Sequence, residues 1–205
     1  WDVDGVALSD NGAWLAANVN VEGRRELHVF DARTLKEHTL PALPAGSVSG
    51  MAFHPKTAEL SFSLASAKGP GQIHTLNLAS QAVAAWTQPY VPPALASATF
   101  SEHQIVRWRS FDGLPISGLL NLPPARYTGK RPVLIAIHGG PEGQATVGFL
   151  NRNNYYINEL GFAILQPNVR GSSGFGKRFL SLDDGFKRED SVKDIGALLD
   201  WIATQ

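Results

Sequence analysis

The pattern of apolar residues along the chain changes near residue 90, and this change constrains the fold more than any other feature. Residues 1 to about 88 predict short strands at close spacing, separated by turn sequences such as Ser9-Asp10-Asn11-Gly12 and His54-Pro55-Lys56-Thr57. From Arg131 onward, apolar runs of strand length alternate with stretches of helical periodicity. The sequence therefore predicts an all-β part followed by an α/β part.

The strands of the first part repeat at an interval of about 45 residues, which is within the range of the four-stranded blades of a β-propeller. Val6–Leu15 aligns with Met51–Leu60, and Glu26–Asp31 aligns with Gln72–Asn77. The alternative is two similar meanders in a β-sandwich. We favour blades, because an isolated repeat cannot bury its faces and repeats of this length stack. Two blades do not close a ring, so we also expect the chain to be a segment of a longer protein.

A proline-rich linker separates the two parts. Three prolines within five residues begin it, and they disfavour both helix and central strand. We therefore predict propeller blades over residues 1–88, a linker over 89–103 and the α/β part over 104–205. The α/β part opens with a hairpin, in which Gln104–Arg109 and Pro115–Leu120 flank Asp112-Gly113, a preferred two-residue turn.

Strands and helices alternate in the rest of the second part. Val133–Ile137 and Phe162–Leu165 are short continuous apolar runs, which predict strands buried on both faces. Helical spacing links Leu150 to Leu160 between them, and Gly161 is the predicted stop. A last helix carries one apolar face, formed by Val192, Ile195, Leu199 and Ile202. This alternation implies a parallel sheet with covering helices.

Composition excludes several classes of protein. The 18 basic residues equal the 18 acidic ones, which argues against nucleic-acid and membrane-surface binding. The chain has no Cys, so disulfides, zinc-finger chemistry and a thiol nucleophile are excluded. The six His residues are scattered without ligand spacing, and we expect neither a metal nor a cofactor. No apolar run reaches the roughly eighteen residues of a membrane span.

The sharpest motif is His138-Gly139-Gly140-Pro141, directly after the first buried strand. Two glycines allow a tight turn that leaves backbone N–H groups pointing outward, and such a loop supplies an oxyanion donor in acyl-transfer enzymes. The alternative is a glycine turn with an incidental His. Its position at the carboxyl end of a strand, where open α/β sheets bind ligands, favours the oxyanion loop.

Two other motifs fail. Gly171–Lys177 nearly matches a phosphate-binding loop, but Arg178 stands where a Ser or Thr must bind Mg²⁺, so we do not predict nucleotide binding. The Gly-x-Ser-x-Gly nucleophile elbow is also missing. Gly46 and Gly50 surround Val48, and Gly139 and Gly143 surround Pro141. The triad order that accompanies this elbow is Ser, then Asp or Glu, then His. The last His of the chain is His138, so no later candidate acid is followed by a His. The oxyanion loop is therefore present without a nucleophile, acid or base.

Taken together, the repeat and these motifs resemble the prolyl oligopeptidase family of serine peptidases, in its acylaminoacyl-peptidase and dipeptidyl-peptidase-like branch. The resemblance covers the whole chain. It is carried by Phe111–Ile116, His138–Glu142, Asn168–Gly176, and Asp194 with the apolar helix up to Trp201.

The resemblance implies the C-terminal blades of a β-propeller followed by the N-terminal half of an α/β-hydrolase domain. It implies that a backbone N–H of Gly139 or Gly140 stabilises the oxyanion. It places a second loop near the active site, formed by Arg170, Gly171, Ser172, Ser173 and Gly174. The family's Ser, Asp and His would all follow Gln205.

We therefore expect a segment of a serine peptidase that hydrolyses oligopeptides or acylated peptides through an acyl-enzyme, and expect this 205-residue chain alone to be inactive. An α/β-hydrolase esterase and a non-catalytic propeller interaction module are the alternatives. The expected partner is a peptide substrate, with no nucleic acid and no membrane span, and homo-oligomerisation of the longer protein stays open. The compartment is undetermined, although the lack of Cys fits a soluble bacterial-type cytoplasmic or periplasmic protein.

Overall fold

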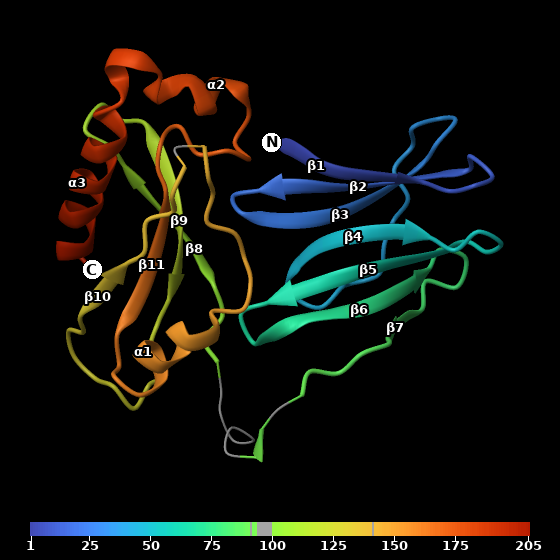
Figure 1. Ribbon diagram of the computed structural model, residues 1–205, viewed down its shortest axis with the longest axis horizontal. Coiled ribbons are helices and arrows are strands. Elements are labelled where there is room, and N and C mark those ends of the chain that lie inside the picture. Colours follow the sequence, from blue (N-terminus) through green and yellow to red (C-terminus); the bar gives the residue numbers. More distant parts are fainter. Residues whose placement is uncertain (91, 94–99, 141) are drawn as a thin grey trace. The chain divides into compact units, whose positions relative to one another are not determined.

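The computed structural model describes residues 1–90, 92–93, 100–140 and 142–205 (Figure 1). These residues form two compact units. The first, which we call the β unit, comprises Asp2–Phe100 together with Val147–Phe149. The second, the α/β unit, comprises Trp1, Ser101–Thr146 and Leu150–Gln205. None of the described helices is both long and apolar enough to cross a membrane.

The β unit contains two antiparallel meanders. The first sheet has the order β1-β2-β3, and the second has the order β4-β5-β6-β7. An isolated bridge between Phe30 and Glu37 extends the first sheet beyond β3, on the side where β7 extends the second. The strands are β1 (Asp2–Leu8), β2 (Trp14–Val21), β3 (Arg24–Asp31), β4 (Ser47–Phe53), β5 (Glu59–Ser66), β6 (Gly69–Asn77) and β7 (Val83–Ala85).

The sequence repeat corresponds to equivalent positions in these meanders. Asp31 ends β3 and its side chain accepts the N–H groups of Arg33 and Thr34, which closes a turn. Asn77 ends β6 and caps the next turn in the same way. One core joins both sheets, with Ala16, Val29, Val48, Leu60, Phe62, Leu64, Leu76 and Leu78 buried in it. Neither described sheet is closed on itself, so membership of a propeller stays a prediction.

The α/β unit is built on a four-stranded sheet of order β10-β11-β9-β8. β10 and β11, the two strands of the alternating part, are parallel as predicted, whereas β9 pairs antiparallel with both β11 and β8, so the whole sheet is mixed. The reason is the opening hairpin, which adds two antiparallel strands. The elements are β8 (Gln104–Arg109), β9 (Pro115–Asn121), β10 (Val133–Ile135), α1 (Asn154–Asn158), β11 (Ala163–Asn168), α2 (Lys177–Leu180) and α3 (Asp190–Ala203).

The predicted hairpin is present, but its turn is longer than two residues. Ser110 donates its N–H to the carbonyl of Leu114, and Gly113 donates to the carbonyl of Ser110. Three residues, Phe111 to Gly113, therefore form the connection, and Gly113 takes a positive φ of 81°. Such a loop is the next most common hairpin connection after the two-residue turn.

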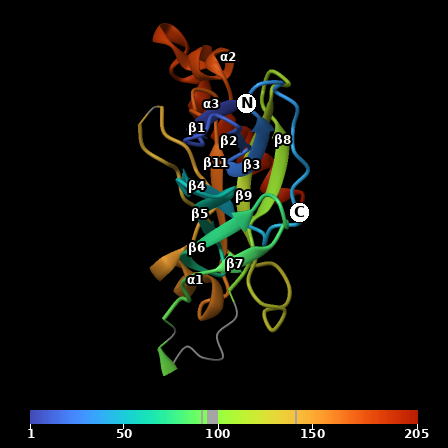
Figure 2. The same ribbon diagram turned by 90° about the vertical axis from the view of Figure 1, so that its right-hand side faces the viewer.

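Both faces of the sheet are covered. Successive residues of β11 point to opposite faces, so neighbouring residues pack against different layers. Leu165 packs with Trp108, Ile116 and Leu198 on the face against which α3 lies (Figures 1 and 2). Ile164, the next residue back, packs with Leu150 and Ile157 on the α1 face.

The predicted apolar face of the last helix is only partly correct. Val192 and Leu199 are 68% and 54% exposed, whereas the buried residues of α3 are Asp194 and Leu198. The spacing of hydrophobic residues alone defines the expected buried face of the helix, so this face cannot include a buried aspartate. The partners of that aspartate lie outside the helix, in loops of the same unit.

Candidate active site

The loop after β10 is a tight glycine turn. Gly140 has a φ of 145°, and a Cβ added there would lie 2.5 Å from the backbone nitrogens of Glu142 and Gly143. A Cβ at Gly143 would collide with the carbonyl oxygen of Gly139. Only glycine can therefore occupy either position without moving the backbone. Gly139 itself faces open space, and Pro141, the last residue of the predicted oxyanion motif, lies outside the described residues.

The loop after β11 contains a second obligatory glycine. Gly171 has a φ of 85°, and a Cβ there would collide with the carboxylate of Asp183. Asp183 is buried and forms an ion pair with Arg188 at 2.6 Å. Gly171 also donates its N–H to the carbonyl of Phe179 at 3.1 Å. The backbone at Gly171 is therefore packed directly against a buried carboxylate.

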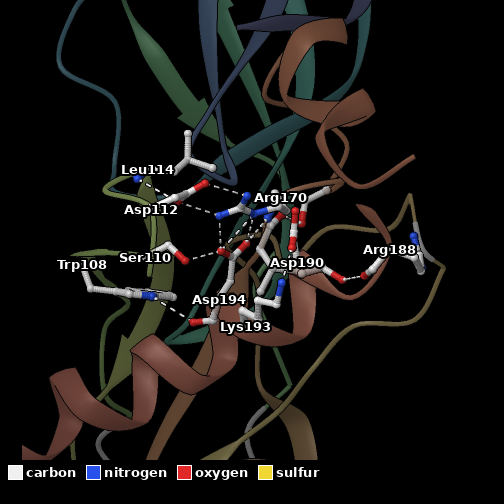
Figure 3. A network of polar contacts seen from close by, with 12 residues as sticks. Trp108, Ser110, Asp112, Leu114, Arg170, Arg188, Asp190, Lys193 and Asp194 are labelled. Atoms are coloured by element: carbon white, nitrogen blue, oxygen red, sulfur yellow. Dashed lines mark hydrogen bonds and ion pairs between the residues drawn. The ribbon is translucent and has the colours of Figure 1, made fainter. Parts of the chain in front are cut away.

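Arg170, the residue before this glycine, is the centre of a buried polar network (Figure 3). Its guanidinium donates to both carboxylate oxygens of Asp112 at 2.9 Å. It also donates to Asp194 at 2.8 Å, and its backbone N–H donates to the other oxygen of Asp194 at 2.9 Å. Such a paired, bidentate geometry suits a buried arginine.

Further contacts complete the network. The Ser110 hydroxyl donates to Asp194 at 2.5 Å, and the indole N–H of Trp108 donates to the backbone carbonyl of Asp194 at 3.3 Å. The guanidinium of Arg170 lies 4.7 Å from the ring centre of Phe111. The network therefore ties the turn after β8, the loop after β11 and the first half of α3 together (Figure 3).

The charges of the network stabilise one another. Hydrogen bonding from Arg170 lowers the pKa of Asp112 below its usual value. Burial by itself lowers the pKa of Arg170, but hydrogen bonds to Asp112 and Asp194 outweigh burial, so the pKa is raised. Arg170 is therefore a permanent cation whose role is structural rather than acid–base chemistry.

The two predicted loops are joined directly. His138 Nε2 lies 2.9 Å from the hydroxyl oxygen of Ser172, and Ser173 donates its N–H to the carbonyl of Gly143 at 3.1 Å. Asn168, at the end of β11, exchanges two hydrogen bonds with the backbone of Ala145. Both loops therefore meet at the carboxyl ends of the parallel pair β10 and β11, where ligands bind in open α/β sheets.

The Ser172–His138 contact is not a catalytic pair. Ser172 is fully buried, and its hydroxyl donates to the carbonyl oxygen of Val169 at 2.6 Å. Nδ1 of His138 lies 3.1 Å from the carbonyl oxygen of Gly139, and no carboxylate contacts the ring within the described part of the chain. A nucleophile must be accessible and its base must be oriented by a third group, and neither condition is met.

Sequence reasoning located both loops but missed what holds the second one in place. It did not predict that Asp112 and Asp194 both pair with Arg170, or that Ser110 donates to Asp194. The available signal was an arginine two residues after a buried strand, because a buried cation requires acidic partners. In the described ranges, no cluster of His, Asp and Glu could hold a metal ion.

Comparison with known proteins gives matches in both sequence and fold. No family model matches the chain. The chain is 30% identical over 114 residues to dipeptidyl peptidase family member 6 of Caenorhabditis elegans, a match that covers 45% of this chain and 15% of that protein. The chain therefore spans a small part of the curated relative it matches.

The solved structures show a shared fold. A prolyl endopeptidase structure superposes with a TM-score of 0.78 at 17% identity, over 99% of this chain and 29% of that one. The acylaminoacyl peptidase of Pyrococcus horikoshii superposes with a TM-score of 0.77 at 20% identity, over 100% of this chain and 31% of that one. The chain is therefore similar in sequence to a dipeptidyl peptidase family member, and it shares its fold with a prolyl endopeptidase and an acylaminoacyl peptidase.

Proposed function

We propose that this chain is part of a serine peptidase of the prolyl oligopeptidase family, and that the loop from His138 to Gly143 binds the oxyanion formed during acyl transfer. The observation that carries the proposal is the tight glycine turn after β10, in which Gly139 and Gly140 are exposed. The similarity to peptidases in sequence and fold supports the same function.

The loop has the properties that oxyanion binding requires. Attack on a peptide carbonyl places a negative charge on the carbonyl oxygen, and fixed backbone N–H donors stabilise that charge without reorganising. We assign one donor to the N–H of Gly139 or Gly140. Removing one such donor costs roughly 100- to 1000-fold in kcat. We propose that the tight turn at Gly140, where an added Cβ would collide with the backbone, keeps the donor in place before substrate binds.

The remaining catalytic groups are proposed to lie outside this stretch of 205 residues. Ser172 and His138 are in contact, but a buried serine cannot reach a substrate. The chain spans 15% of its curated relative, which leaves room for a Ser, a His and an acid elsewhere in a longer protein. The substrate is then an oligopeptide or an acylated peptide, cleaved through an acyl-enzyme.

Fluorophosphonate labelling tests this proposal. We expect no stoichiometric label on the 205-residue chain and one label on a longer protein that includes the nucleophile. Label on the short chain that disappears in Ser172→Ala would contradict our assignment, because it would make Ser172 the nucleophile. Hydrolysis of simple esters but not of aminoacyl or acyl-peptide amides by the longer protein would indicate an esterase instead.

A further inference from the structure

We propose that Ser172 is a positioning residue that fixes the imidazole of His138 as an Nε2–H donor and thereby holds the glycine loop in shape. The inference deepens the proposed function and rests on it for its catalytic meaning. The hydrogen-bond geometry on which it stands does not depend on that function.

The single hydrogen of the Ser172 hydroxyl determines which residue donates in the Ser172–His138 hydrogen bond. A serine hydroxyl has one hydrogen and two acceptor lone pairs. That hydrogen is directed to the carbonyl of Val169, because the oxygens are 2.6 Å apart, whereas His138 Nε2 lies 2.9 Å away. The hydroxyl oxygen therefore accepts from His138, and Nε2 carries the proton. This tautomer is assigned from the hydrogen-bond network.

A proton on Nε2 leaves the other ring nitrogen of His138, Nδ1, without one. In a neutral imidazole with a proton on Nε2, Nδ1 carries a lone pair. That lone pair lies 3.1 Å from the carbonyl oxygen of Gly139, which is also an acceptor. Two acceptors do not attract each other, so the Gly139 contact does not hold the ring. Ser172 holds the ring in this position.

The ring in turn supports the loop. The position of a Cβ on Gly143 would lie 2.9 Å from His138 Nδ1 and would overlap the carbonyl of Gly139, so the ring and the turn are packed against each other. Ser172 is itself fixed, because it follows Gly171, which packs on Asp183, and Arg170, which is paired with Asp194. Support therefore passes from α3 through Arg170 and Ser172 to the proposed oxyanion loop.

The tautomer is measurable without any catalytic activity. In the folded, ¹⁵N-labelled 205-residue chain, a long-range ¹H–¹⁵N spectrum recorded where imidazoles are neutral distinguishes Nε2–H from Nδ1–H rings. The signal of His138 is identified by its loss in His138→Gln. We expect a single Nε2–H tautomer for His138. An Nδ1–H ring, or a ring averaged over both tautomers, overturns the proposal without requiring a Ser172 variant to fold.

A variant pair provides the second arm. In Ser172→Ala, Nδ1 can take the proton and donate to Gly139, so the His138 signal is expected to move toward the Nδ1–H pattern. Amide exchange at Gly139 and Gly140 should then rise about fivefold, as expected for one lost hydrogen bond. Ser173→Ala is the matched control, because Ser173 bonds to Gly143 through its backbone N–H, which the substitution keeps. An unchanged tautomer in Ser172→Ala, or equal changes in both variants, overturns the proposal. Neither result bears on whether the longer protein is a peptidase.

Discussion

Asp194 accepts hydrogen bonds from both the backbone N–H and the guanidinium of Arg170, in a position where Asp194 is 0% and Arg170 4% exposed. Asp194 lies in α3 and Arg170 lies in the loop after β11, and α2 and two short 3₁₀ helices stand between them in the sequence. A buried ion pair is not by itself a source of large stability, but removing one partner leaves an uncompensated buried charge. The pair therefore makes the conformation of the loop dependent on the position of the helix.

The first prediction concerns the loss of that carboxylate. Asp194→Asn is expected to lower the free energy of unfolding by about 3–5 kcal/mol, because it leaves the buried Arg170 with one partner fewer. Urea denaturation measures the change. Asp190→Asn is the control, since Asp190 forms only a partly exposed pair with Lys193 on the same helix and should cost less than about 1 kcal/mol. Equal losses in the two variants would contradict the role given to Asp194.

The second prediction concerns acid sensitivity. The pKa of Asp112 is lower in the folded chain than its ordinary value of 3.8, chiefly through hydrogen bonding from Arg170. The unfolded chain therefore binds this proton first, so the stability contributed by Asp112 is present above about pH 4 and is lost as the pH falls through the folded pKa. Asp112→Asn should make the free energy of unfolding less dependent on pH in that range.

The effect of Asp112 is expected to be modest, because 42% of its side chain is exposed and solvent screens the pair. Asp200→Asn is the matched control. Asp200 is exposed on α3, and within the described ranges its carboxylate makes no hydrogen bond or ion pair. An equal flattening of the pH profile in the control would show that net charge, rather than the Arg170 contact, is responsible.

The third prediction separates steric collision from backbone strain. Gly171 and Gly176 have nearly the same positive φ, 85° and 84°. A Cβ at Gly171 collides with the Asp183 carboxylate, whereas a Cβ at Gly176 meets open space. Gly176→Ala should therefore cost about 1–3 kcal/mol from backbone strain alone, because its φ of 84° and ψ of 158° are almost confined to glycine, and Gly171→Ala should cost roughly 1–3 kcal/mol more. Thermal or urea unfolding that gives the same loss for both would exclude the packing explanation.

Local chemistry in the sequence was sufficient to predict much of the fold. The turn formed by Asp31 and its counterpart Asn77 recurs because each side chain caps its own backbone, an interaction between residues close in sequence. The hairpin of β8 and β9 follows in the same way from strand alternation around a glycine. These features depend on neighbours along the chain, which is why the pattern predicts them.

What the sequence did not predict depends on contacts between distant segments. The burial of Asp194 results from Arg170 and Ser110, which lie 24 and 84 residues away. A helix considered alone favours an apolar face, so the pattern predicts that Val192 is buried, although it is exposed. The antiparallel pairing of β9 with β11 is likewise a choice between distant strands that no local pattern specifies. The position of the two candidate loops could be predicted, but the hydrogen bonds that join them could not.

The last prediction tests the oxyanion loop in a longer protein that hydrolyses peptides. Gly140→Ala should reduce kcat roughly 100- to 1000-fold with a smaller effect on KM, because the displaced donor acts mainly on the transition state. The displacement follows from the 2.5 Å separation between the added Cβ and the nitrogens of Glu142 and Gly143. Gly129→Ala is the matched control, since Gly129 also has a positive φ, of 74°, but its Cβ would meet open space. If both variants keep normal kcat, or if both lose it together with their fold by circular dichroism, the loop at Gly140 does not have the specific role that we assign to it.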